Sequence, residues 1–455
     1  IAEATPPTAA MKDVIPPGTE PAVTSPAPST LPDVPEIRHQ LWLRDPYRMT
    51  MVTNPDNNKW MIMTRSREVD LQLENPELTD WRGVVADRWI GVTSPFRTSV
   101  IPESCGWRAS VPGQTVFQFI DGQTAGLRLL RGRAALQVSD DVRVDEVGPV
   151  SIRLKTGSQE ITVSLKTAAT RIGVQVNIQP LQAEGSQADE PDSTEDPTGE
   201  MIPSDAQLRA VLFVAEGEAD VQLPGSEERQ TLNRSDSLQW TVAGESEMAG
   251  ITFQQGNELD ALPSWIYDIE QPPVAELQDV MQQIADRISI SDEPATAAVE
   301  LTGDRNPSVG VAATDILVLS RAVRPLFEIL MAAESESVRR AAIDGLSEIS
   351  NSSAEGKRRV RDALENRLAS DETVITERLI EGPTEAEARD TESVAAMMKL
   401  LDHQLLGLRE LALYRMQQFT GDRFAYHADS DPARRHEAVR RWKRHVERND
   451  GKLLP

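Results

Sequence analysis

The sequence predicts a multidomain protein in which an all-β antiparallel sandwich precedes an all-α region, behind a disordered proline-rich N-terminus. Three observations lead to this fold class. Nine prolines lie within the first 35 residues, apolar residues recur at every second position from about residue 37 to 253, and a helical period begins after Pro272 and Pro273. A period of two is typical of half-buried strands, and a period of 3.6 is typical of amphipathic helices.

Length and composition restrict the function before any motif is considered. The 455 residues are enough for two to four domains. The formal net charge of −25, from 47 basic and 72 acidic side chains, disfavours non-specific binding to nucleic acid or to an anionic membrane. A single cysteine excludes a disulfide framework and a thiolate zinc cluster. No apolar run reaches the ~18–20 residues of a membrane helix.

The proline-rich segment 1–36 predicts an extended spacer, because it cannot bury enough apolar surface to offset its ordering entropy. Such a segment at a start that is not methionine, Ile1, resembles the stalk left after a signal peptide or a membrane anchor. We therefore expect an exported protein, periplasmic or in the cell envelope, tethered to the membrane by an anchor missing from this chain. A cytosolic protein with a disordered tail is the alternative.

Two further breaks divide the rest of the chain. Segment 182–207 carries acids without any basic residue, so like-charge repulsion predicts a solvated linker. The acids lack the regular spacing of a calcium loop. We expect a β-sandwich at 37–181, a smaller β module at 208–270 and a helical domain at 271–455. The acids of the linker are Glu184, Asp189, Glu190, Asp192, Glu195, Asp196, Glu200 and Asp205.

Short alternating runs separated by turn residues such as Asp121-Gly122 and Gly132 predict the strands of the β region. Because no helical pattern separates them, we expect antiparallel pairing. The first set comprises 59–63, 115–119, 126–130, 134–138, 150–154, 160–165 and 172–176. The second comprises 212–214, 219–223, 237–241 and 250–253.

A local pattern recurs in both strand sets and reads as a strand, a tight glycine turn and a second strand. It is Leu127-x-Leu129-x-x-Gly132-x-Ala134-x-Leu136-Gln137-Val138 in the first set and Leu212-x-Val214-x-x-Gly217-x-Ala219-x-Val221-Gln222-Leu223 in the second. This arrangement resembles the FecR-type β-domain of bacterial signalling proteins. The resemblance implies a sensing or signal-relay role with protein contact as the output. An unrelated β-sandwich is the alternative.

Three tryptophans, Trp81, Trp89 and Trp107, lie in a stretch that could supply a sugar-stacking platform, although clustered tryptophans are more often core residues. Cys105 would need a base to act as a nucleophile. The only histidine of the β region, His39, is not placed near it by any pattern, so we expect an inert thiol.

The helical region contains an internal repeat. A shift of 70 residues superposes 325–331 on 395–401 and 338–350 on 408–420 without gaps. In each second helix, apolar residues at i, i+4, i+5, i+8 and i+11 predict a buried stripe, and the arginine after the first aliphatic, Arg339 or Arg409, is expected to point outward. Such helix pairs bury their stripes by stacking on neighbours.

The run 336–346, with Val338-Arg339, Ala342 and Leu346, resembles the second helix of HEAT-type repeats. The resemblance implies a short helical array with a concave docking face. Between the two copies we expect a charged helix pair at 357–380 and a loop at 381–390. An unrelated helical bundle is the alternative.

The last helix is predicted to begin at Asp431 as N-cap, with Pro432 in its first position and an inward stripe of Val439, Trp442 and Val446. Seven Lys and Arg residues lie between Arg434 and Arg448. We expect this cationic helix to pack on the acidic body, and we expect any charged partner at this end. His427, His436 and His445 are too far apart to ligate one metal from one helix face, so we expect no metal and no cofactor.

No nucleotide loop, nucleophile elbow or acid–base pair stands out. We therefore expect no enzyme but an envelope scaffold or signal-relay protein, which binds a protein partner and no nucleic acid through its β and helical modules. One alternative is a protein that binds carbohydrate or a cell-wall polymer through its tryptophans. Another is an enzyme whose site is assembled across domains. The candidate binding surface comprises Trp81, Trp89, Trp107, Arg339, Arg409, Arg440 and Arg441.

Overall fold

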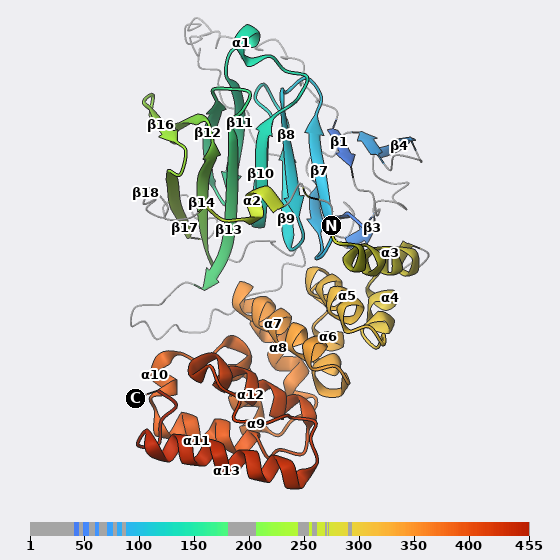
Figure 1. The fold of residues 1–455 in the computed structure, drawn as a ribbon, viewed down its shortest axis with the longest axis vertical. Helices are drawn as coiled ribbons and strands as arrows, with labels where there is room; N and C mark the ends of the chain where they lie inside the picture. Colours follow the sequence, from blue (N-terminus) through green and yellow to red (C-terminus); the bar gives the residue numbers. More distant parts are fainter. Residues whose placement is uncertain are drawn as a thin grey trace, which may run out of the picture. The chain divides into compact units, whose positions relative to one another are not determined.

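A computed structural model confirms a β-sheet region followed by a C-terminal helical region (Figure 1). The predicted stalk at 1–36 and linker residues 182–205 lie outside the described residues, as does His39. The residues that the structure describes are 41–44, 49–53, 60–62, 71–75, 80–83, 88–180, 206–243, 254–256, 262–268, 271, 273–289 and 294–454.

One set of strands forms an antiparallel sheet. Alternate residues of β7 and β8 are buried, which confirms the period of two. In spatial order the strands are β4 (Leu71–Asn75), β5 (Asp80–Gly83), β1 (Leu41–Arg44), β7 (Arg97–Pro102), β8 (Trp107–Pro112), β10 (Gly126–Val138), β13 (Arg171–Pro180), β14 (Ala206–Glu216), β17 (Ser237–Ala243) and β18 (Gln254–Gly256).

A second set of strands also contains β10. Its pairing of β10 with β11 is parallel, and its other pairings are antiparallel, as predicted. The order is β3 (Trp60–Ile62), β2 (Met51–Thr53), β6 (Trp89–Val92), β9 (Thr115–Ile120), β10, β11 (Val150–Thr156), β12 (Gln159–Leu165), β15 (Glu218–Gln222) and β16 (Arg229–Asn233).

The strands on either side of the predicted linker share these sheets. β14 pairs with β13 in the first sheet, and β15 pairs with β12 in the second. The sequence boundary between the two predicted β modules therefore does not coincide with a boundary between sheets.

The repeated glycine pattern marks a corner where the chain passes from one sheet to the other. Residues 126–131 of β10 pair in the second sheet and residues 132–137 pair in the first, whereas β14 and β15 pass in the opposite direction across Gly217. Both glycines have positive φ, +96° at Gly132 and +71° at Gly217. A Cβ at either would overlap a threonine, Thr115 or Thr170 respectively. The predicted tight turn is thus a change of sheet, which glycine permits because it adopts positive φ and leaves room for a close backbone approach.

Two one-turn helices, α1 (Val144–Val147) and α2 (Trp265–Asp268), accompany the strands. Ile266 of α2 is buried against the outer side of β13, where Gly173 leaves room for its side chain. The helices that follow are α3 (Ala275–Ser289), α4 (Pro294–Leu301), α5 (Pro307–Leu319), α6 (Val323–Ala332), α7 (Glu336–Ser352), α8 (Ala354–Glu365), α9 (Ser370–Glu381), α10 (Glu385–Ala388), α11 (Thr391–Leu400), α12 (Leu406–Thr420) and α13 (Pro432–Arg448).

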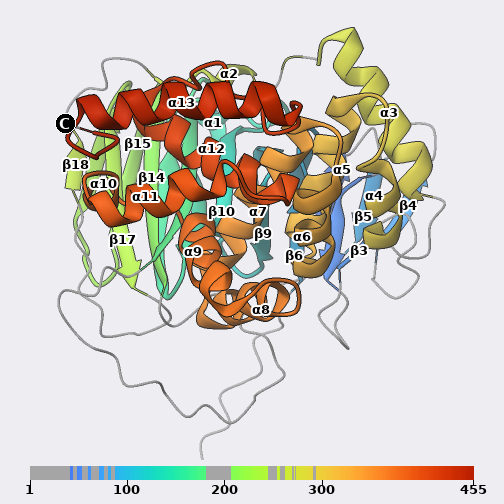
Figure 2. The same cartoon turned by 90° about the horizontal axis from the view of Figure 1, so that it is seen from below.

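The 70-residue repeat corresponds to two helix pairs, α6 with α7 and α11 with α12 (Figure 2). The predicted stripe of α7 is buried, and the equivalent stripe of α12 is buried except for half-buried Phe419. The predicted pair between the copies is α8 and α9. The expected loop at 381–390 instead contains α10, because Thr384 and Glu387 form a capping box that begins a further helical turn.

Helix α13 begins as predicted. Asp431 accepts hydrogen bonds from the backbone N–H groups of Ala433 and Arg434, and Pro432 occupies the first turn. Trp442 has no exposed surface and Val439 is buried, so this stripe faces the helical core. Phe424 packs edge-on against Trp442, with ring centroids 4.6 Å apart. In both views α13 lies beside α11 (Figures 1 and 2).

Candidate functional site

The two repeated arginines hold the connection between the helices of their own pair. Nη1 of Arg339 donates to the carbonyls of Ala333 and Glu334, at 2.7 and 2.8 Å. Nη1 of Arg409 donates to the carbonyls of the equivalent residues His403 and Gln404, at 2.6 and 2.8 Å. Carbonyls beyond the end of a helix have no intrahelical partner, and a guanidinium can satisfy two of them at once.

The expectation that these arginines point outward is therefore wrong. Arg339 is 0% exposed and Arg409 is 7% exposed. A guanidinium can be buried at low cost only where most of its donors are satisfied. The carbonyls of the interhelical connection and the carboxylate of Glu410 engage the two terminal nitrogens of Arg339, whereas its buried Nε has no hydrogen-bond partner in the described part of the chain. Neither arginine can belong to a binding surface of the folded chain.

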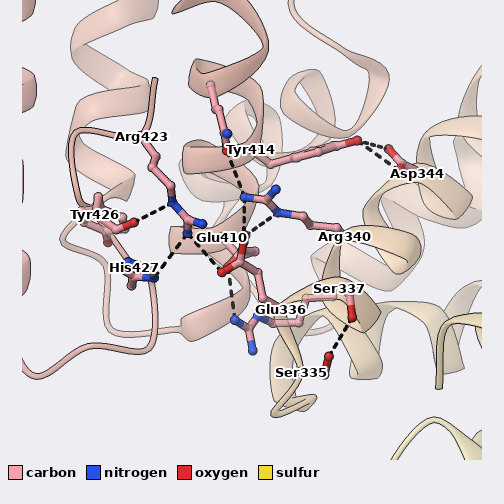
Figure 3. Close-up of polar contacts among 12 residues, drawn as sticks. Ser335, Glu336, Ser337, Arg340, Asp344, Glu410, Tyr414, Arg423, Tyr426 and His427 are labelled. Carbon is pink, nitrogen blue, oxygen red and sulfur yellow. Dashed lines mark hydrogen bonds and ion pairs between the residues drawn. The ribbon is translucent and has the colours of Figure 1, made fainter. Parts of the chain in front are cut away.

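A buried carboxylate, Glu410, joins the two helix pairs (Figure 3). Its Oε2 accepts from Nη2 of Arg339 at 3.2 Å and its Oε1 accepts from Nε of Arg340 at 3.1 Å. The Glu410 side chain has no exposed surface. Arg340 also donates to Gln417 at 3.0 Å. Since Arg340 and Glu410 occupy the same position of the 70-residue repeat, the copies meet with opposite charges at one register position.

A second pair of equivalent positions also meets. The Tyr414 hydroxyl donates to the Asp344 carboxylate, whose oxygens lie 2.8 and 3.0 Å away. The guanidinium carbons of Arg340 and Arg415 lie 5.3 and 5.4 Å from the centroid of the tyrosine ring. Burial is the largest cause of the raised pKa of Tyr414, and the hydrogen bond to Asp344 and the charge of Asp344 raise it further. Burial also raises the pKa of Asp344. Tyr414 therefore remains a neutral hydrogen-bond donor at neutral pH.

The rim of this network connects α7 to the turn after α12 (Figure 3). Glu336 accepts from Arg423 at 3.0 Å and pairs with Arg340 at 2.9 Å. Partial burial alone would raise the pKa of Glu336, but the hydrogen bond from Arg423 and the charges of Arg340, Arg423 and Arg339 lower it. Arg423 also donates to the carbonyl of Tyr426 at 3.1 Å. The carboxylates of the network are thus engaged by arginines or Tyr414, which suits a joint between helices better than an acid–base site.

The structure places the other two candidate arginines on α13. Arg440 is exposed. Arg441 is half-buried and pairs with Glu437 at 2.6 Å. Lys443, Arg444 and Arg448, which were not included in the candidate binding surface, are also exposed. Helical spacing of Arg440, Arg444 and Arg448 at i, i+4 and i+8 would have indicated that they share one face with Arg440.

The three tryptophans do not form an observable platform. Trp107 has no exposed surface and lies in the core, so its proposed role as a surface residue is wrong. Trp89 is half-buried, with the guanidinium carbon of Arg128 at 5.2 Å from its ring centroid. Trp81 lies in β5, and its side chain is outside the described residues.

Cys105 is half-buried, and its Sγ donates to the carbonyl of Glu103 at 3.3 Å. Burial, and to a lesser extent the negative charge of Asp121, raises the pKa of the thiol to about 11. The thiolate is the nucleophilic form, so this environment opposes catalysis at neutral pH.

The three C-terminal histidines have separate neighbours. His427 lies near Arg423, His436 lies 3.1 Å from Asp402, and His445 lies near the carbonyl of Leu453. Within the part of the chain that the structure describes, no group of three or more His, Cys, Asp or Glu residues is placed to hold a metal ion. Among the same described residues, no helix is both long and apolar enough to cross a bilayer.

Comparison with known proteins adds little. No family model matches the chain, and no curated protein matches it. Two crystal structures of a "putative anti-sigma factor" from Parabacteroides distasonis are similar, at 13% and 16% sequence identity and a TM-score of 0.21. Each match covers 37% of this chain and 60% of that protein. A likeness at this TM-score carries no conclusion about function. None of these comparisons supports the HEAT-type resemblance, which stays a prediction.

Proposed function

We propose that this chain is a non-enzymatic scaffold or signal-relay protein of the cell envelope that binds a protein partner through its helical region. The observation that carries the proposal is the contact of equivalent repeat positions, Arg340 with Glu410 and Asp344 with Tyr414. Helices that meet at equivalent positions are stacked in register. Stacked helix pairs, as in HEAT-type arrays, are rigid and present extended surfaces to partners.

The chemistry of the network supports binding over catalysis. Glu410, its most deeply buried acid, faces two guanidinium groups and has no exposed surface. A substrate cannot reach such a group without opening the contact between α7 and α12. The network therefore favours a fixed relative position of the two helix pairs, which a docking surface requires.

The envelope location rests on composition. The proline-rich segment 1–36 and the acidic segment 182–205 lack the apolar content of a packed core, as expected for a stalk and a linker. In this proposal the FecR-like β region relays the signal, and the helical region contacts the partner. Burial of Trp107 weighs against the carbohydrate alternative, because it removes one of the three aromatic rings proposed for stacking.

Site-specific photo-crosslinking in cells that express the full chain tests the proposal. A photoreactive residue replaces Arg324, Glu392 or Lys443 in the helical region, all exposed, and Arg229 or Glu227 in the β region as matched exposed controls. We expect one protein to be crosslinked from the helical positions, and we expect the purified partner to bind the purified chain directly.

Two outcomes contradict the proposal. In the first, the same protein is captured equally from helical and control positions, or purified components fail to bind. In the second, cell-wall polysaccharide retains the purified chain, and Trp89→Ala abolishes retention while the folded circular-dichroism spectrum is unchanged. That second result would establish the carbohydrate alternative.

A further inference from the structure

The outward face of α13 carries cations that the rest of the described structure does not use. Arg440, Lys443, Arg444 and Arg448 are exposed, and they make no hydrogen bond or ion pair with any residue that the structure describes. Other arginines of this helix are occupied. Arg434 pairs with Asp431 at 3.3 Å, and Arg435 donates to the carbonyl of Ser430 at 2.5 Å. We call the four unused residues the α13 cationic face.

Packing of a basic helix on an acidic body does not explain this face. The buried stripe of Ala438, Val439 and Trp442 turns toward the body, so the cationic side turns away from it. The helix dipole favours cations only in the last turn, which includes Arg448 but not Arg440. The chain as a whole carries −25, so a row of free cations departs from its average surface.

The spacing of the face defines what fits it. Arg440, Arg444 and Arg448 lie at i, i+4 and i+8, which places successive side chains about 6 Å apart along the helix axis. Carboxylates at i, i+4 and i+8 of a second helix have the same spacing. An acidic helix laid alongside α13 can therefore pair each of its carboxylates with one arginine.

Two acids on α13 distinguish this occupant from a uniform polyanion. Glu437 is exposed one turn before the cationic row, and Glu447 is exposed between Arg444 and Arg448. Evenly spaced phosphates, as in nucleic acid or on an anionic membrane, lie against these carboxylates as well as against the arginines, whereas a protein helix can place neutral residues opposite the glutamates and its own carboxylates opposite the arginines. The net charge of −25 adds long-range repulsion of such polyanions.

We infer that the α13 cationic face is the docking site of the partner, and that its occupant is an acidic helix of that partner protein. This inference rests on the proposed function and specifies the chemistry of the binding surface. Because exposed ion pairs are weak singly, affinity comes from several matched pairs and depends on ionic strength.

Fluorescence anisotropy of a labelled alanine-based helical peptide, with glutamates at i, i+4 and i+8, tests the inference on the full chain. We expect saturable binding that weakens about tenfold between roughly 50 and 500 mM salt. The double variant Arg440→Glu/Arg444→Glu should weaken binding by at least about tenfold. The control Arg229→Glu/Arg234→Glu makes the same change in net charge at two exposed arginines of the β region and should stay within about twofold. Because all four side chains are exposed, thermal unfolding should be unchanged in both variants.

Three results with the peptide would overturn the inference. They are equal loss of peptide binding in the test and control variants, equal affinity for a peptide with the same glutamates at i, i+2 and i+5, and no peptide binding at all. Tighter binding of single-stranded RNA or phosphatidylglycerol vesicles through the same arginines would also overturn it. If photo-crosslinking from the helical region still captures a partner that binds directly, only this inference fails and the proposed function stands.

Discussion

The two helix pairs of the 70-residue repeat differ in a way that separates internal architecture from assembly. Arg339 of α7 and Arg409 of α12 donate to carbonyls of equivalent residues, so the same bond builds each pair. The next position differs. It is Arg340 in the first pair and Glu410 in the second, and the two form an ion pair. Shared positions thus shape each pair, and divergent positions join one pair to the other.

A further divergent position shows that each pair also has its own neighbours. Gly345 of α7 leaves room for Val318 of α5, which a Cβ would overlap. The equivalent Arg415 of α12 instead donates to the carbonyls of Leu379 and Ile380 of α9, at 2.7 and 2.8 Å. The second copy thus contacts α9 through the hydrogen bonds of Arg415. The first copy packs closely against α5 because Gly345 has no side chain.

The largest expected effect comes from breaking the joint at Glu410. Glu410→Gln removes the negative charge between Arg339 and Arg340 and leaves Arg339 buried without a counter-ion. We expect a loss of about 3 kcal/mol in the free energy of unfolding, because an uncompensated buried charge is costly. Chemical denaturation measures it, with exposed Glu392→Gln as control. A loss below about 1 kcal/mol would show that the joint is not stabilised by charge.

The two repeated arginines should differ in proportion to what they hold. Arg409→Met removes the bonds to the interhelical connection and the bond from Nε to the carbonyl of Ala428, at 2.7 Å, and should cost about 2 kcal/mol. Arg339→Met removes the equivalent bonds to the connection and also leaves the buried carboxylate of Glu410 without one of its two arginine partners. We therefore expect the free energy of unfolding to fall by about 1 kcal/mol more than in Arg409→Met. Denaturation of both variants under identical conditions gives the comparison. Equal losses would mean that the contact of Arg339 with Glu410 contributes no more than the single bond of Arg409 to Ala428.

Gly132 and Gly217 occupy equivalent positions of the repeated pattern in the β region, and substitutions there test whether both positions require glycine for the same reason. Gly132→Ala and Gly217→Ala each place a methyl group against a threonine at positive φ, so we expect losses of about 2 kcal/mol or more. Gly225 has φ +71° and open space around it. Gly225→Ala should therefore cost only about 1 kcal/mol, the conformational part of the effect. If thermal denaturation gives the same loss for all three variants, close packing at the corners contributes nothing.

The smallest effect concerns the second pair of equivalent positions. Tyr414→Phe removes the hydrogen bond to half-exposed Asp344 and keeps the ring between the two arginines. We expect a loss of about 1 kcal/mol, typical of one hydrogen bond to a charged group near the surface. A loss as large as that of Glu410→Gln would place the main joint between the copies at Tyr414.

Periodicity made the elements predictable. The alternation at 115–119 and the stripe that includes Val338 and Leu408 depend on residues near one another in the chain, and both give the expected element. The cap at Asp431 followed from local chemistry in the same way. The sharing of both sheets by strands on either side of segment 182–205 was not predictable, because pairings such as β12 with β15 join residues far apart in sequence.

The orientation of individual arginines was not predictable. Arg339 and Arg440 are both arginines on amphipathic helices, yet one is buried and the other exposed. The difference depends on whether carbonyls and a carboxylate from other elements lie within reach, and one sequence does not reveal such contacts. Opposite charges at equivalent repeat positions, as at Arg340 and Glu410, were a usable signal for the joint. Helical spacing was a usable signal for Lys443, Arg444 and Arg448.

The central claim is that the two helix pairs form one rigid unit because Glu410 of the second pair balances Arg339 of the first. A double-mutant cycle with Arg339→Met and Glu410→Gln tests it most directly by chemical denaturation. We predict a coupling free energy of about 2 kcal/mol between these residues, with the parallel cycle of Arg361→Met and Glu410→Gln additive to within about 0.5 kcal/mol, because Arg361 of α8 pairs with Glu377 and not with Glu410. Additivity in both cycles would contradict the claim, since the two pairs would then be held together by something other than this buried contact.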